Sequence, residues 1–442
     1  MTDIHLTREI LRALLRGEVP GRMVVQIGLQ HLMSVCPSCR QEVEAFEREQ
    51  TAGAAAGYNR TFEILPALLQ DQVARLATEQ REARRDLSEL LRLPREERAG
   101  RVRRARDRFR SAALVRLLIE NSQKHIPEKP ADAFHLAELA RTVAHSNPRM
   151  PEHFDLIVLA TAHMANACRV GDTPRQAEDH VLHARHVIRT HGVTHPEVLA
   201  RVDDLEGSLR KDQRLFEKAE ELLARAAMLY RLVNASEDAA RVLINLGTVY
   251  NLRGESPRAI DTTRSALDMM PPESAPRLYL CGRFNLAWQL FTAGRRQEAE
   301  DALDVDADLY RRFADSWTQL RLTWLRGNLA ESRGEVERAE QAYRETRDGF
   351  IAEGRGYDAA LVSMDLALLY LRQGRSDSVR HLAEEMVPIL LAQDVHREAL
   401  AALILFQDAA RRDELTIEKV SAAAAALQET RGNRARAVSP PI

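Results

Sequence analysis

Two cysteines and two histidines near the start of the chain have the residue types and spacing of a metal site. Cys36 and Cys39 form a Cys-x-x-Cys pair, which can place two thiolates on one tetrahedral ion. His31 lies just upstream, and His5 is a candidate fourth ligand. These four residues predict a zinc site. The alternatives are a redox dithiol or two inert thiols at the cysteine pair, and a solvated side chain at His5.

Short helices must position these ligands. The sequence predicts a helix over residues 8–16, a turn over 17–21 and a second helix over residues 22–33. A charged helix is expected over 40–50, and the Gly- and Ala-rich residues 51–57 indicate a flexible joint. This unit has few large apolar residues, so a bound ion would supply much of its folding free energy.

The same segment resembles the zinc-binding domain of bacterial anti-sigma factors. In that family an upstream ligand is followed by His-x-x-x-Cys-x-x-Cys at the end of a helix, often after Leu-x-Gly-Glu-Leu-Pro. The matching residues here are Leu15-Arg-Gly-Glu-Val-Pro20, His31-Leu32 and Cys36-Pro-Ser-Cys39. This chain departs by one extra residue between His31 and Cys36. The resemblance implies a zinc-finger-like domain that docks on a sigma factor, and some members use the thiolates to sense oxidation.

The stretch Ala240–Pro271 has the pattern of two antiparallel helices joined by a break at residues 251–256. It resembles a tetratricopeptide repeat (TPR), in which small residues on facing sides let the two helices approach closely. Seven of the eight diagnostic positions are in register, and only Thr263 stands where an aromatic is usual. The matching residues are Leu243, Leu246, Gly247, Tyr250, Ala259, Ala266 and Pro271.

Equivalent small residues recur with a period of 40 from Gly207 onward. In the first helix of each unit they are Ala165, Gly207, Gly247, Ala287, Gly327 and Ala367. In the second helix they are Ala177, Ala219, Ala259, Ala299, Ala339 and Val379. We expect about eight helical pairs, stacked into a right-handed solenoid with a concave inner surface, because one pair cannot bury its own apolar face.

These patterns predict an all-α protein in four parts. They are an anti-sigma-like zinc-binding domain at 1–57, a charged helical connector at 58–112, a TPR-like array at 113–430 and a disordered tail at 431–442. The formal net charge of −2 provides no field to attract nucleic acid or a membrane surface. No signal peptide or long apolar run occurs, and Arg greatly outnumbers Lys. We therefore expect a cytoplasmic bacterial protein.

Aromatic and Asn side chains fall on the first helices of successive repeats, which line the inner groove of such an array. These candidate partner-binding residues are Asn245, Asn285, Trp288, Phe291, Trp324, Asn328 and Leu371. They suit an extended peptide, with Asn pairing its backbone. The alternative is that Trp288 and Trp324 belong to the core between repeats.

Other motifs give weaker signals. Residues 101–110 are the most basic segment and suit nucleic acid, or a solvated face whose arginine stems cover apolar surface. His180 and His183 share a helix face, but no set of further ligands completes a metal site. No local catalytic motif is present, so we predict no enzyme activity and no catalytic residue.

The predicted function is therefore regulation through binding. We expect an adaptor or signalling protein that binds a protein or peptide partner in the repeat groove, while the zinc domain docks a partner such as a sigma factor. One alternative is a redox sensor in which oxidation of Cys36 and Cys39 releases zinc. Another is a nucleic-acid-associated regulator that uses residues 101–110.

Overall fold

The chain is described here by a computed structural model. The residues that it describes are 75, 77–105, 108–126, 129–171, 173–392, 406 and 416–433. Every regular element in these ranges is a helix, which confirms the all-α fold class for this part of the chain. The predicted zinc-binding domain at 1–57, with His5, His31, Cys36 and Cys39, lies outside the described residues.

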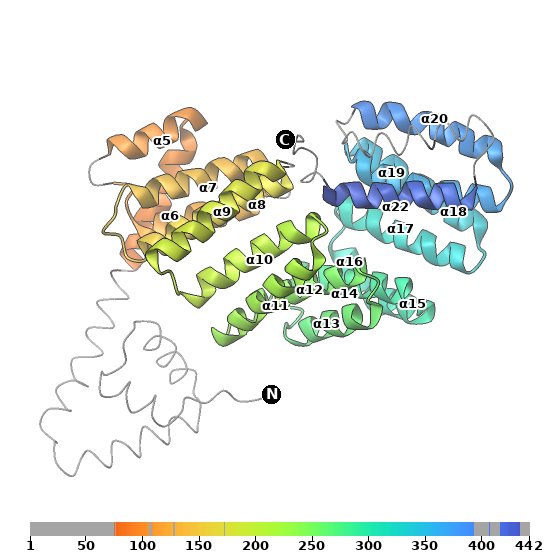
Figure 1. The fold of residues 1–442 in the computed structure, drawn as a ribbon, viewed down its shortest axis with the longest axis horizontal. Helices are drawn as coiled ribbons and strands as arrows, with labels where there is room; N and C mark the ends of the chain where they lie inside the picture. The colour runs from red at the N-terminus through yellow and green to blue at the C-terminus, as the bar shows by residue number, and fades with distance from the viewer. Residues whose placement is uncertain are drawn as a thin grey trace, which may run out of the picture. The chain divides into compact units, whose positions relative to one another are not determined.

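The helices belong to two compact units (Figure 1). The first unit contains the described residues up to His125 with Asp132–Thr161 and Val187–Val198, and the second contains Ala162–His186 and the described residues from Leu199 onward. A helix covers residues 77–92, and it is followed by α5 (Arg95–Arg104), α6 (Ala112–His125), α7 (Pro130–His145), α8 (His153–Val170) and α9 (Pro174–His191). The next helices are α10 (Pro196–Asp212), α11 (Phe216–Leu232), α12 (Ser236–Leu252), α13 (Ser256–Asp268), α14 (Pro276–Thr292) and α15 (Arg296–Val305). The last are α16 (Ala307–Arg312), α17 (Ser316–Ser332), α18 (Val336–Ala352), α19 (Gly356–Arg372), α20 (Ser376–Ala392) and α22 (Ile417–Asn433).

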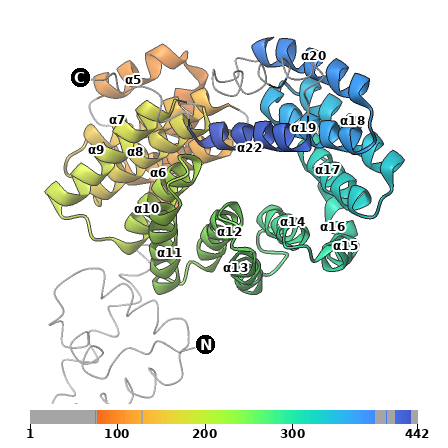
Figure 2. The same cartoon turned by 45° about the vertical axis from the view of Figure 1, so that its right-hand side comes forward.

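Helical hairpins follow one another through the second unit, as a TPR-like solenoid requires. The hairpins are α12 with α13, α14 with α15, α17 with α18, and α19 with α20 (Figures 1 and 2). Before them, Gly207 of α10 lies against Leu223 of α11. The small residues predicted for first helices and second helices lie in those helices, from Gly207 in α10 to Val379 in α20. The repeat pattern therefore predicted this part of the fold correctly.

Small residues are needed where the two helices of a hairpin touch. A Cβ added at Gly247 of α12 would lie 2.3 Å from Thr263 Oγ1 and 3.2 Å from the Ala259 carbonyl oxygen, both on α13. Thr263 is fully buried, so the position at which the sequence lacked an aromatic residue is filled by this close contact. At the turn between the helices Gly254 has φ +79°, a conformation that glycine adopts without steric cost.

One hairpin departs from the regular unit. Its second helix is divided into α15 and α16 at Asp306, a break that the 40-residue spacing did not reveal. Arg283 of α14 donates from Nε to the Asp306 carboxylate at 2.6 Å. Burial raises the pKa of Asp306, and Arg283 opposes that rise.

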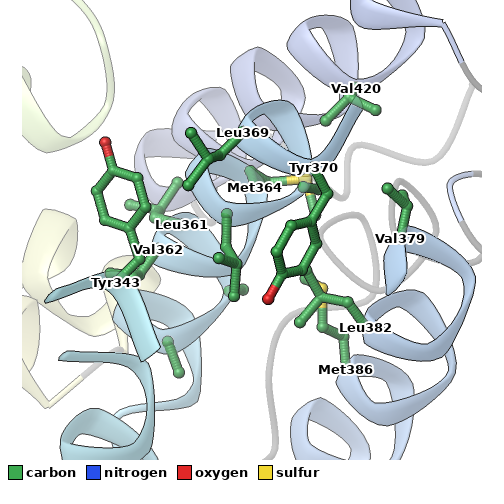
Figure 3. Packing of buried hydrophobic residues seen from close by; sticks show 14 of the residues in the cluster. Tyr343, Leu361, Val362, Met364, Leu369, Tyr370, Val379, Leu382, Met386 and Val420 are labelled. Atoms are coloured by element: carbon green, nitrogen blue, oxygen red, sulfur yellow. The ribbon is translucent and has the colours of Figure 1, made fainter. Parts of the chain in front are cut away.

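The C-terminal helix α22 packs against α19. Val420 of α22 is fully buried and belongs to the same apolar cluster as Leu361, Met364 and Leu369 of α19 (Figure 3). The helix continues to Asn433, past residue 431, where the sequence predicted the tail to begin. None of the described helices combines the length and the apolar character needed to cross a membrane.

Candidate functional site

The first helices of successive repeats share a face on which side chains bridge one repeat to the next. We call it the first-helix face and define it by Ser208, Asn245, Thr248, Asn285, Trp288, Trp324 and Asp365, which come from α10, α12, α14, α17 and α19. Four of the predicted groove residues are thus on one surface of the second unit. Its bridging contacts are described next from the N-terminal to the C-terminal end.

Asparagine amides form the polar part of this face. The Asn245 amide donates from Nδ2 to Ser208 Oγ at 2.8 Å, and its Oδ1 accepts from Lys211 Nζ at 2.9 Å. One repeat later, Asn285 donates from Nδ2 to Thr248 Oγ1 over a longer distance of 3.4 Å. Both asparagines are partly exposed. The sequence predicted their position on the first helices, but it did not predict these neighbours as their partners.

Aromatic rings form the apolar part. The Trp288 and Trp324 ring centroids are 5.4 Å apart with planes at 68°, so this pair joins α14 to α17. Phe284 and Phe291 of α14 flank Trp288 at 6.2 and 6.4 Å. Trp288, Trp324 and Phe291 are partly buried and pack on the cores of their repeats. The aromatic side chains therefore contribute to the core and also keep exposed edges on the first-helix face.

The face ends at a carboxyl group in an unusual environment. Trp324 Nε1 donates to Asp365 Oδ2 of α19 at 2.7 Å. Burial raises the pKa of Asp365 to about 7, although the Trp324 hydrogen bond favours the ionised form. Glu331 raises the pKa further, and Glu331 itself accepts from Tyr343 Oη at 2.7 Å and pairs with Arg372. Asp365 can therefore change its charge near neutral pH.

The last two predicted groove residues are differently placed. Asn328 donates from Nδ2 to the Trp324 backbone oxygen at 2.9 Å, so its amide is turned towards its own helix. Leu371 packs on the apolar cluster that α22 shares with α19. These contacts do not test whether either residue binds a partner.

A buried network of charges on α10 is the feature that sequence reasoning missed. Asp203 is 1% exposed and accepts hydrogen bonds from Arg185 at 2.6 Å and from Arg225 at 2.5 and 2.7 Å. The Arg185 guanidinium also binds Glu206 at 2.7 Å. A run of Asp-Asp-x-Glu in the middle of a repeat helix was the available signal. Because its charges are compensated by arginines, the network fixes the positions of neighbouring helices and leaves no bare charge to attract a ligand.

The adjacent Asp204 binds Arg201 of its own helix and Arg241 of α12, the first helix of the next repeat. Burial alone would raise the pKa of Asp204, but Arg241 and Arg201 hold it below its usual range. Arg201 donates from Nε to His163 Nε2 at 3.3 Å. Burial and the two arginines lower the pKa of His163 well below its usual value, so the imidazole is neutral at pH 7.

The structure gives contacts for part of the two weaker candidate sites, the basic segment 101–110 and the His180–His183 pair. Within the basic segment 101–110, Arg101 binds Glu89 at 2.9 Å, and Arg108 binds Asp86 at 2.5 Å and Glu89 at 2.8 Å. Both guanidinium groups also lie over the Phe109 ring. His180 and His183 lie on α9, but no group of three or more potential metal ligands occurs among the residues that the structure describes.

Comparisons with known proteins place the fold. No protein-family model matches this sequence, and no curated protein matches it. The crystal structure of a Rap protein complexed with competence and sporulation factor aligns with TM-score 0.56 at 14% identity, over 72% of this chain and 87% of that one. The apo form of RapI aligns with TM-score 0.49 at 13% identity, over 70% and 85% of the two chains.

A TPR-like kinesin light chain protein from Podosopora anserina aligns less well. Its TM-score is 0.35 at 17% identity, over 45% of this chain and 95% of that one. At these identities the first Rap structure shows the fold alone. The chain is similar to it as a TPR-like array of helical repeats.

Proposed function

We propose that this chain is a regulatory or adaptor protein that binds a peptide, or an extended segment of a partner protein, on the first-helix face. The observation that carries the proposal is the Trp288–Trp324 pair beside Asn285, which combines apolar area with backbone-pairing amides across a repeat boundary. Interfaces take most of their affinity from such aromatic anchors, and amides orient an extended backbone.

The partner in the similar Rap structure supports this reading. That protein was crystallised with competence and sporulation factor, so an array of this fold has held a separate partner. Extending partner binding to this chain is an inference from fold, and the chemistry must come from its own face. Asn285 can exchange its 3.4 Å hydrogen bond to Thr248 for a backbone group of a bound peptide at little cost.

The zinc-binding domain is a separate proposal that rests on the sequence. In it, residues 1–57 bind zinc through Cys36, Cys39, His31 and His5 and dock a protein partner, with a sigma factor as one candidate. The redox-sensor alternative uses the same thiolates. Zinc content before and after mild peroxide separates the two roles, because a sensor releases its metal and a docking domain retains it.

The partner-binding proposal is tested by selecting peptides from a random display library on the full chain. Trp288→Ala should weaken the selected peptides by about 30-fold, the ~2 kcal/mol expected for a central tryptophan. Met228→Ala is the control, since Met228 is 61% exposed on the second helix α11. Circular dichroism must show that both variants keep their helix content. Equal affinities for the two variants, or no selected peptide at all, would refute the proposal.

A further inference from the structure

The first-helix face changes character at its C-terminal end. Three positions of this face recur at the 40-residue spacing, and in α12 they are occupied by Arg241, Thr248 and Asn251. In α14 the same positions are Cys281, Trp288 and Phe291, and in α17 they are polar again, as Arg321, Asn328 and Glu331. In α19 all three are leucine: Leu361, Leu368 and Leu371. The leucine row of α19 is therefore suited to packing against another helix.

The helix α22 provides that cover. Leu361 is 8% exposed, and Leu368 and Leu371 pack on the same apolar cluster as Val420, Ala423 and Ala424 of α22. Helix α22 contacts α19, whose own hairpin partner is α20, and Figure 2 shows one end of α22 beside α19. Among the described helices, α19 is the one on which α22 packs extensively. Helix α22 thus lies on the first helix of a repeat, at positions that are partly exposed in α12 and α17.

Over the part of α22 whose side chains the structure describes, up to residue 426, the docking side is made of small residues. Val420 is fully buried, Ala423 and Ala424 are partly buried, and Ser421 and Ala422 are exposed. Ile417, the large apolar residue at the start of the helix, is 47% exposed. These residues bury little apolar area compared with leucine or aromatic side chains, so this part of the contact contributes only weakly to docking. Tethering keeps it in place, because a segment on the same chain has an effective concentration of about millimolar.

We infer that α22 is a built-in ligand of the array, which covers the α19 end of the first-helix face and must be displaced by a partner segment that presents larger apolar side chains. The biological role of this inference rests on the proposed partner binding. The contact of α22 with α19 does not depend on that proposal. The tethered helix sets a threshold: a partner binds only if its affinity exceeds that of α22 at its effective concentration. An incoming segment with leucine or aromatic residues would fill the surface over Leu361, Leu368 and Leu371 better than alanine does.

The test uses the full chain and a probe of known sequence. The probe is a fluorescein-labelled synthetic peptide with the sequence of residues 416–433, and its binding is followed by fluorescence anisotropy. Val420→Glu places a charge in the buried contact and should release α22, so the probe should bind this variant at least ten-fold more tightly than the wild-type chain. Ser421→Glu places the same charge on the exposed side of the helix and should leave binding of the probe at the wild-type level.

Folding is checked by cooperative thermal unfolding, and a chain that ends at residue 415 is the second variant. The inference holds if each variant that folds binds the probe at least ten-fold more tightly than the wild-type chain does. A folded variant that fails to bind the probe overturns it. If both variants lose cooperative unfolding, α22 is part of the minimal fold and the inference is also wrong. Library peptides that bind no variant, alongside a probe that binds Val420→Glu, would instead count against the proposed function alone.

Discussion

Replacing Asp365 with asparagine should stabilise the protein at neutral and alkaline pH. The Asp365 carboxyl is held within the array, and its hydrogen bond from Trp324 Nε1 does not outweigh the cost of burying its charge. Asparagine keeps an oxygen that accepts the same hydrogen bond, and it cannot ionise. The substitution therefore removes the cost of the charge and keeps the shape of the contact.

The magnitude follows from the pKa. The folded protein raises the pKa of Asp365 from 3.8 to about 7, so the folded state holds this proton more tightly than the unfolded chain. Stability then falls as pH rises between these two values, and the cost is complete only above the folded pKa. At 1.36 kcal/mol per unit, the full cost is at most roughly 4 kcal/mol. Between pH 5 and pH 8 the cost should grow by roughly 2.5 kcal/mol.

Urea unfolding of the wild-type chain and Asp365→Asn at pH 5, 6, 7 and 8 measures this difference. The advantage of Asp365→Asn should be smallest at pH 5 and largest at pH 8. Asp348→Asn is the control, because it makes the same substitution at an exposed position of α18, outside the contact between Trp324 and Asp365. Parallel pH profiles for wild type and Asp365→Asn, or a less stable Asp365→Asn at pH 8, would refute the assigned environment.

Three further predictions follow from the packing, the buried charges and the sequence motif. Gly247→Ala should lower the unfolding free energy by about 1–3 kcal/mol, measured by urea unfolding, because its Cβ would lie 2.3 Å from Thr263 Oγ1. Asp203→Asn should cost about 1–3 kcal/mol in the same assay, since it weakens the hydrogen bonds that the buried carboxylate accepts from the half-buried Arg185 and the exposed Arg225, and an unchanged midpoint would contradict the network. Metal analysis of the full chain should find bound zinc that Cys36→Ser loses and Cys281→Ser retains, and a zinc-free wild-type protein would exclude the site.

The repeat architecture was predictable because its signals are local. A small residue at each helix contact and a turn between the two helices of a pair recur along the sequence at a fixed spacing. Propensity, periodicity and close packing all favour the same helices, so a single sequence was sufficient. The boundaries of the predicted domains were not tested in this way and stay predictions.

The side-chain partners were not predictable, because they depend on residues far apart in the chain. A buried Asp203 carboxylate would be unfavourable without partners. Its partners Arg185 and Arg225 are 18 and 22 residues away in the chain, so the local sequence did not reveal them. Asn245 was correctly assigned to a first helix, but its bond to Ser208 spans 37 residues. The contact of α22 with α19 is similar, since an alanine-rich helix carries no pattern that names its docking site.

The most direct test of partner binding is site-specific photo-crosslinking with a selected library peptide. A benzoylphenylalanine placed at position 288, on the first-helix face, should crosslink to the peptide in the full chain. The same group at position 228, exposed on α11, should not. Crosslinking at position 288 that unlabelled peptide competes away is the result we predict. Crosslinking at position 228 with none at 288 would show that the peptide binds the second helices, and it would contradict the proposed function.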